Sequence, residues 1–198
     1  MKPLVIDIYH GDLVKSFDQV KEAGVRAVIH KASEGTNPDN RYTARRKIFT
    51  DLGLKYGAYH FFHGDGIKEA DFFLNVAEPD KDLVLALDWE NTAHTPNAKQ
   101  ARAFLERIEE KLGRKAVIYS GNVAKEKIIG KDTFFGSHLL WLAQYANHWK
   151  VQESWTKPWL WQYGSEITKT RVPGINSYCD VNDILDADPE KFFENWGK

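Results

Sequence analysis

The sequence has little cysteine, no excess of positive charge and no long apolar run, which argues against a disulfide-rich protein, a nucleic-acid-binding protein and a membrane-spanning protein. It contains one cysteine, Cys179, so no disulfide can form within the chain. Its 27 Lys and Arg residues balance 28 Asp and Glu residues, which gives no electrostatic case for a nucleic acid or an anionic membrane surface as partner. No apolar run approaches the roughly 18–20 residues that cross a bilayer, so we expect no membrane insertion.

The N-terminal segment also lacks an apolar core of the roughly 7–15 residues found in signal peptides, because Asp7 interrupts it. We therefore expect a chain that is made in the cytoplasm without a cleaved signal. A length of 198 residues fits one core, and no linker or low-complexity segment divides it. The expectation is a single domain over residues 1–198, without a separate second module, and a monomer.

Short apolar runs alternate with helical patterns through the first two-thirds of the chain. Five runs rich in Val, Ile and Tyr are typical of parallel strands buried on both faces, at 4–8, 27–30, 56–61, 83–89 and 116–119. Helical patterns between them end at Gly24, Gly53 and Gly113. The clearest helix is predicted to start at a Thr95–Pro96 cap. Repeated strand–helix units predict a parallel sheet.

Beyond residue 129 the pattern changes, because strand-like segments at 139–145, 158–163 and 178–181 follow without convincing helices between them. A terminal helix is predicted from Pro189. Five strand–helix units and three bare strands make eight strands, enough to close a barrel. The predicted fold is an α/β, TIM-barrel-like (β/α)5(β)3 barrel, and a flat doubly wound sheet is the alternative.

Four acids follow or end predicted strands, where a parallel barrel carries its functional groups. Asp88 and Glu90 come after an apolar run and stand two apart, so they point the same way in an extended chain. Asp7 ends the first predicted strand and Asp180 the last, and these strands are neighbours in a closed barrel. Two carboxyl groups, one protonated and one ionised, are the chemistry of glycoside hydrolysis. Solvent-facing acids at a strand end are the alternative.

Other predicted strand ends carry side chains suited to binding a sugar. Amide and phenol groups offer neutral hydrogen bonds, and aromatic rings offer stacking faces. The predicted substrate-binding residues are Lys31, Tyr59, His60, Tyr119, Gln144, Tyr145, Trp161 and Gln162. Core packing is the alternative for each ring, and an ion pair is the alternative for Lys31. Neither a P-loop nor a dinucleotide fingerprint is present, and we expect no cofactor.

Eight short segments carry a further signal: VIDI (5–8), HKASEG (30–35), GAYHF (57–61), LDWE (87–90), VIYS (117–120), LWLAQY (140–145), LWQY (160–163) and CDVN (179–182). In this order, over nearly the whole chain, they resemble the family 25 glycoside hydrolases, lysozymes that act as N-acetylmuramidases on bacterial peptidoglycan. The resemblance implies a barrel with five helices and three helix-less strands, which matches the organisation described above.

The resemblance also implies roles for the acids. Glu90 would be the general acid that protonates the leaving glycosidic oxygen, and Asp88 would stay ionised beside the reacting sugar. Asp7 and Asp180 would complete the pocket floor. Attack by Asp88 itself and attack by the substrate's own 2-acetamido oxygen both remain open, and we favour substrate assistance with retention of configuration. The enzyme would act on the glycan strands of the cell wall, reached by lysis, a holin or a secretion system.

One segment departs from the family. After Asp7 the chain continues with Ile8-Tyr9-His10-Gly11-Asp12, which is shorter than the family's aromatic-Gln-Gly turn and lacks its glutamine. Sugar contacts by this first loop are therefore not carried over.

Two other functions compete. A metal-dependent hydrolase on the same barrel would use His60 and His63, or Asp7 and His10, each three apart. No HExxH or paired-cysteine signature supports it, and we expect no metal. A glycan-binding module that lost its chemistry is the non-enzyme alternative, although a pure binder has little reason to keep all four acids.

Overall fold

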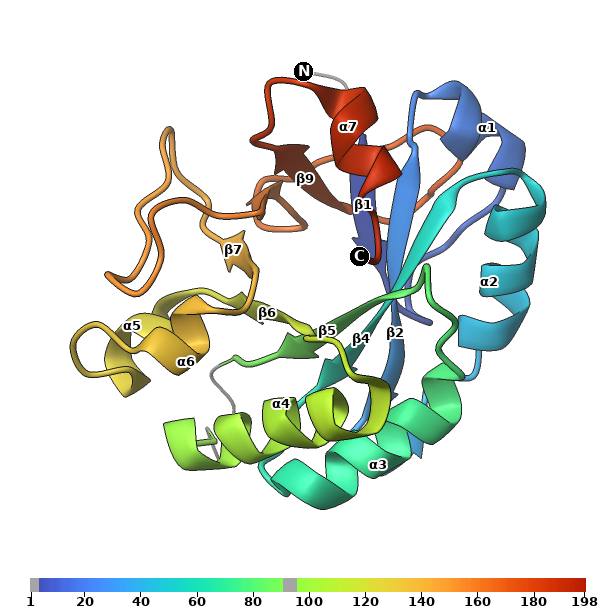
Figure 1. Ribbon diagram of the computed structural model, residues 1–198. Helices are drawn as coiled ribbons and strands as arrows, with labels where there is room; N and C mark the ends of the chain where they lie inside the picture. Colours follow the sequence, from blue (N-terminus) through green and yellow to red (C-terminus); the bar gives the residue numbers. More distant parts are fainter. Residues whose placement is uncertain (1–3, 91–95) are drawn as a thin grey trace.

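The computed structural model describes residues 4–90 and 96–198. Eight strands close into a barrel with helices around its outside (Figure 1). Their order is β1 (Val5–Ile8), β9 (Asp180–Ile184), β8 (Leu160–Gly164), β7 (Leu140–Ala143), β6 (Val117–Ser120), β5 (Val84–Asp88), β4 (Lys55–Phe61) and β2 (Ala27–Glu34), which pairs with β1. The short β3 (Asn37–Pro38) pairs only with β2. The predicted barrel is confirmed, and the flat sheet is wrong.

The last strand runs against the others. Neighbouring strands from β1 through β2, β4, β5, β6 and β7 to β8 are parallel, whereas β9 is antiparallel to both β8 and β1. The prediction that Asp180 ends the last strand is therefore wrong, because Asp180 begins β9. Reversal of the strand brings this first residue to the mouth formed by the carboxyl ends of the others, directly opposite Asp7 in the strand register.

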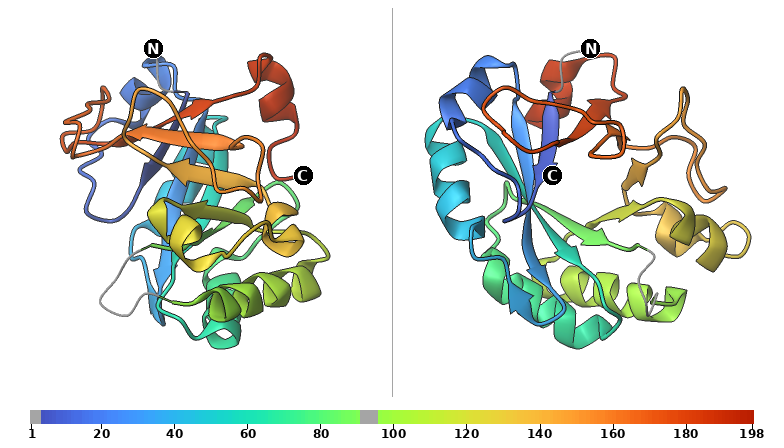
Figure 2. Two further views of the ribbon diagram at one scale, coloured as in Figure 1. Left: turned by 90° about the vertical axis from the view of Figure 1, so that its left-hand side faces the viewer. Right: turned by 180° about the vertical axis from the view of Figure 1, so that it is seen from behind.

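The helices follow the predicted units closely. They are α1 (Phe17–Glu22), α2 (Tyr42–Asp51), α3 (Gly66–Ala77), α4 (Ala98–Leu112), α5 (Asn122–Lys127), α6 (Thr133–Gly136) and α7 (Pro189–Glu194). Helices α2, α3 and α4 pack around the outer face near β2, β4 and β5 (Figures 1 and 2). Only the short α6 adds a helix where residues 129–188 were expected to have none. No described helix has the length and apolar character needed to cross a membrane.

Glycine ends three helices as the sequence predicts. Gly24, Gly53 and Gly113 have positive φ angles of 100°, 80° and 66°, a region that residues with a Cβ rarely adopt. The predicted start of α4 is wrong, because Asn97 caps it in a capping box with Gln100. Pro96 precedes that cap, and Thr95 lies outside the described residues.

Alternation along the strands divides the core into two layers. Side chains such as Val5, Ile29 and Ala86 fill the barrel interior, whereas Ile6, Val28 and their counterparts pack outward toward the helices. The inward series continues toward the mouth, so the last inward residue of β1 is Asp7 and that of β5 is Asp88. The strand period therefore aims these acids at the barrel axis.

Candidate active site

A cleft of about 630 Å³ opens at the mouth of the barrel. All four acids singled out in the sequence line it: Asp7, Asp88, Glu90 and Asp180. They come from β1, the end of β5 and the start of β9, so segments far apart in the sequence converge on one hollow. Rings of Tyr59, Tyr119 and Trp141 form part of its surface.

Asp7 sits at the floor and is 6% exposed. The Gln162 amide Nε2 donates to both carboxyl oxygens at 3.0 and 3.1 Å, and Asn182 Nδ2 donates to Oδ2 at 2.7 Å. Burial raises the pKa of Asp7 to about 7, although these two donors pull it down. Asp7 is therefore poised to titrate near neutral pH.

Three further hydrogen bonds fix the orientation of the amides. Oε1 of Gln162 accepts from the hydroxyls of Tyr119 and Tyr145 at 2.9 and 2.6 Å, and Asn182 Oδ1 accepts from Trp141 Nε1 at 2.6 Å. Because each amide oxygen is engaged elsewhere, its NH₂ group faces Asp7. Gln162 is 1% exposed and does not line the cleft, so the prediction that it binds substrate is corrected: it supports Asp7 from below.

Asp88 and Glu90 are separated by a ring that points away from them. Trp89 is fully buried, stacks on Phe135 with ring centroids 5.7 Å apart, and donates from Nε1 to the Pro96 carbonyl at 2.8 Å. With Trp89 held on the outer side, both acids face the cleft, as their spacing predicts.

The two acids have different surroundings. Oδ1 of Asp88 is buried and has no hydrogen-bond partner among the described residues. Burial, followed by the charges of Glu90 and Asp7, raises the pKa of Asp88 well above its ordinary value, and Lys31 counteracts part of this. Burial also raises the pKa of Glu90, while a hydrogen bond from Tyr119 lowers it. The pair therefore holds a proton well into the pH range in which free carboxyls are ionised.

Asp180 completes the set. Burial raises its pKa to about 9, and the neighbouring Asp7 and Asp12 carboxyls add to that rise. Four carboxyls this close cannot all carry charge, since like charges in one low-dielectric site oppose each other's ionisation. Some of these carboxyls therefore keep their protons at a pH where free carboxyls are ionised.

The predicted substrate-binding residues divide into two groups. Lys31, Tyr59, Tyr119 and Tyr145 line the cleft. His60, Gln144, Trp161 and Gln162 do not. The prediction is wrong for His60 and Gln162, which are buried, and it stays a prediction for the partly exposed Gln144 and Trp161.

Strand alternation explains why two of these residues do not line the cleft. His60 follows Tyr59 directly and so faces outward, where its buried ring bridges Ser33 Oγ and Glu69 Oε2 at 2.8 Å each. Trp161 precedes Gln162, and its Nε1 donates to the Gln144 carbonyl at 2.7 Å. Gln144 in turn accepts from the Lys150 amide. These side chains stabilise the barrel wall rather than meet the cleft.

Sequence reasoning missed several residues of the site. Asn182 stands two residues after Asp180, and the strand period is the signal that places both on one side. Trp141 lies within a segment that was noted but was not taken as a binding residue. The segment 165–178, which lines one side of the cleft, carries no pattern that predicts its position.

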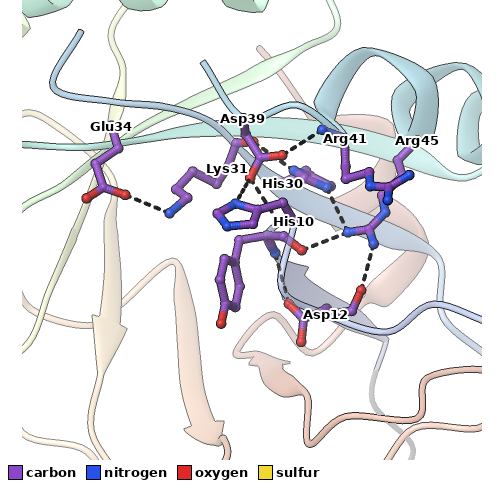
Figure 3. A network of polar contacts seen from close by, with 9 residues as sticks. His10, Asp12, His30, Lys31, Glu34, Asp39, Arg41 and Arg45 are labelled. Atoms are coloured by element: carbon purple, nitrogen blue, oxygen red, sulfur yellow. Dashed lines mark hydrogen bonds and ion pairs between the residues drawn. The ribbon is translucent and has the colours of Figure 1, made fainter. Parts of the chain in front are cut away.

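The short first loop is held by the network in Figure 3. Arg45 of α2 donates to the carbonyls of Tyr9 and Asp12 at 2.7 and 2.6 Å. His10 binds Asp39 through its backbone N at 2.8 Å and through Nδ1 at 3.0 Å. These contacts fix Tyr9, which lines the cleft with its ring centroid 5.0 Å from Lys31 Nζ.

A buried histidine supports the same network. His30 Nδ1 donates to the Lys31 carbonyl, which leaves Nε2 to accept from Arg45 at 3.2 Å. Burial lowers the pKa of His30 to about 4, so the ring is neutral near pH 7 and accepts this bond without repelling the guanidinium.

The histidines considered as metal ligands have other partners. His60 binds Glu69, and His63 Nε2 lies 3.4 Å from Glu34. Within residues 4–90 and 96–198, no group of three or more His, Cys, Asp or Glu side chains is arranged to hold a metal ion.

Comparison with protein families finds one match over most of the chain. The sequence model described as "Glycosyl hydrolases family 25" matches residues 6–174. The autolytic lysozyme of Clostridium acetobutylicum is 39% identical over 90 residues, which cover 44% of this chain and 28% of that protein. This chain thus matches little more than a quarter of that relative's length.

Solved structures are similar over nearly the whole chain. The bacterial lysozyme from Streptomyces coelicolor superposes with a TM-score of 0.85 at 23% identity, covering 97% of this chain and 95% of that one, a likeness of fold. The CTP1L endolysin gives a TM-score of 0.78 at 29% identity, covering 97% of this chain and 69% of that one.

Proposed function

This chain belongs to the glycosyl hydrolases of family 25, and we propose that it is a lysozyme. It would hydrolyse the β-1,4 bond between N-acetylmuramic acid and N-acetylglucosamine in bacterial peptidoglycan, which places its action at the cell wall. The observation that carries the proposal is the convergence of Asp7, Asp88, Glu90 and Asp180 on one aromatic-lined cleft. Burial of these acids in one cleft raises their pKa values. This arrangement is electrostatically unfavourable, but acid catalysis needs a carboxyl that keeps its proton.

Glu90 is the proton donor in this proposal. It belongs to the cleft surface, and burial raises its pKa, which favours the protonated form that a proton donor needs. The neighbouring Tyr119 hydroxyl lowers the pKa of Glu90 and so offsets part of this rise. The group is thus able to release a proton to the leaving oxygen and to take one back from water.

Asp88 positions the reacting sugar. Its buried Oδ1 has no partner among the described residues, and the N–H of a 2-acetamido group is a donor that suits it. With the N–H held there, the acetamido oxygen attacks the anomeric carbon while the glycosidic bond breaks and Glu90 protonates the leaving oxygen. Glu90 then deprotonates the water that opens the resulting ring, so the configuration is retained.

Asp7 and Asp180 act on the sugar by charge and by hydrogen bonding while the bond breaks. Ionised Asp7, held by Gln162 and Asn182, stabilises the positive charge that develops on the sugar as the bond breaks. Asp180, paired with it across the strand register, holds a proton at neutral pH because its pKa is about 9. It is therefore suited to donate a hydrogen bond to a sugar oxygen.

Reducing-end release from purified peptidoglycan tests the proposal. Native protein should release ends that carry N-acetylmuramic acid, and Glu90→Gln should lower kcat by at least ~10²-fold, the lower end of general acid–base catalysis. Glu194→Gln, a change at an exposed glutamate of α7, is the matched control and should keep full activity.

Equal rates for Glu90→Gln and the native protein would refute the role of Glu90, and N-acetylglucosamine at the new ends would refute the bond assignment. Tight binding without any released ends would support a glycan-binding module instead.

A further inference from the structure

One wall of the cleft is not used by the chemistry proposed above. The segment 165–179 joins β8 to β9, and seven of its residues line the cleft: Ser165, Glu166, Ile167, Arg171, Asn176, Ser177 and Tyr178. Backbone bonds tie this β8–β9 wall to the start of the chain, from Lys15 N to the Gly174 carbonyl at 2.8 Å and from Asn176 N to the Leu13 carbonyl at 2.9 Å. The wall is thus a built part of the cleft.

The charges that line the cleft are unequal. Six are carboxyl groups, and two are cations, Lys31 and Arg171. Lys31 is already paired with Glu34 at 2.8 Å. Arg171 is exposed, and its one hydrogen bond among the described residues runs from Nη1 to the Asn176 carbonyl at 2.9 Å. Within that part of the chain it has no carboxylate partner, although Glu166 belongs to the same wall.

The guanidinium group of Arg171 is held in place without being neutralised. Its central carbon lies 4.4 Å from the centroid of the Tyr178 ring, so the cation stacks on a surface that also faces the cleft. The Tyr178 ring covers one face of the guanidinium, and the Asn176 carbonyl accepts from its Nη1. The other N–H groups of the guanidinium remain available as donors, and their planar arrangement fits a carboxylate.

We propose that Arg171, stacked on Tyr178, binds a carboxylate of the peptide that peptidoglycan carries on the lactyl group of its muramic acid. The inference rests on the proposed lysozyme function and specifies which form of the glycan it takes. Those carboxyls of the cleft that are ionised repel an anionic substituent, so a cation favours a peptide with free carboxylates where the peptide leaves the sugar. Arg171 supplies that cation at the rim, already ordered, which lowers the entropic cost of binding.

Two forms of one substrate test this inference. Uncross-linked, peptide-bearing glycan strands are compared with the same strands after their peptide carboxyls are converted to methylamides. The native protein should cleave the free-acid strands with a kcat/KM about three- to fivefold higher, the upper part of the range for one solvent-exposed ion pair. Arg171→Ala should lose that preference through KM, with kcat unchanged, and Arg171→Lys should recover part of it.

A neighbouring cation provides the matched control. Lys169 lies in the same segment but does not line the cleft, and its φ of 56° is one that asparagine tolerates. Lys169→Asn removes the same charge and should keep the native preference. If Arg171→Ala cleaves both forms as the native protein does, or loses equally on both, the inference is wrong.

The source of the carboxylate and the underlying activity are tested separately. Strands stripped of peptide by an amidase keep only the lactyl carboxylate, and a loss by Arg171→Ala on these strands would assign the cation to the sugar and refute the peptide. Calorimetric affinities of Glu90→Gln, with and without Arg171→Ala, for the two peptide-bearing forms test Arg171 without turnover. A native protein that binds with the expected preference but cleaves nothing would refute only the proposed function.

Discussion

Ionisation of Asp7 should make the protein less stable as pH rises. The pKa of Asp7 is raised from 3.8 to about 7 in the folded protein, so folding favours its neutral form. This contribution to stability is complete below about pH 4 and is lost as pH rises through 7. The two values differ by about three pKa units, and at about 1.4 kcal/mol each the full effect is about 4 kcal/mol.

Most of that change falls within an accessible range. Integrating the linkage relation from pH 5 to pH 8 gives a fall of about 2.5 kcal/mol in the free energy of unfolding from Asp7 alone. Asp180 changes stability in the same direction, because its pKa is raised to about 9. Equilibrium unfolding in urea at a series of pH values measures the slope.

Asp7→Asn separates this contribution from the rest of the protein. The variant should flatten the pH dependence and should be more stable than the native protein at pH 8, although less active. Exposed Asp18 is the matched control, and Asp18→Asn should leave the slope unchanged. The reasoning is refuted if stability is constant or rises from pH 5 to 8, or if Asp7→Asn keeps the native slope.

Two further variants probe the supports of the cleft. Gln162→Leu removes two hydrogen bonds that lower the pKa of Asp7. The pH at which Asp7 titrates in an activity profile should therefore move upward. An unchanged profile would contradict the role of Gln162 as a support of Asp7. Arg45→Met removes the donors to the Tyr9 and Asp12 carbonyls and should cost about 2–3 kcal/mol of stability, with a higher KM because Tyr9 loses its support. The control is Arg41→Met, which changes an exposed arginine whose side chain makes no cap hydrogen bond, and a loss of similar size there would contradict the assignment.

The strands of the barrel and the inward direction of its acids are predictable because both follow the alternation of side chains along a strand. Alternation along β1 and β5 aims Asp7 and Asp88 inward, and the same rule applied to Asp88 and Glu90 places both on the cleft side of Trp89. Helix ends at Gly24, Gly53 and Gly113 are equally local, since positive φ favours glycine. Most assignments that rest on short-range geometry therefore agree with the structure; the start of α4 is the exception, because Asn97 caps it.

The remaining differences come from long-range pairing. Nothing in the run 178–181 distinguishes a parallel from an antiparallel strand, so Asp180 was placed at the wrong end of its strand. His60 and Gln162 are polar residues near the mouth. Alternation alone turns His60 outward, where Glu69 binds it, but only the contact with Asp7 reveals that the inward-facing Gln162 is a buried support. The β8–β9 wall is irregular chain whose position depends on contacts with residues 13–16.

Closure of the barrel also has a consequence for synthesis on the ribosome. Strand β9 is the only link between β1 and β8 in the described structure, so the ring stays open until residue 184 has left the exit tunnel. Until then β1 and β8 present unpaired backbone edges, which are sites for association with other chains. The emerging polypeptide needs protection until β9 is available for pairing, and a ribosome stalled before β9 would leave an aggregation-prone intermediate.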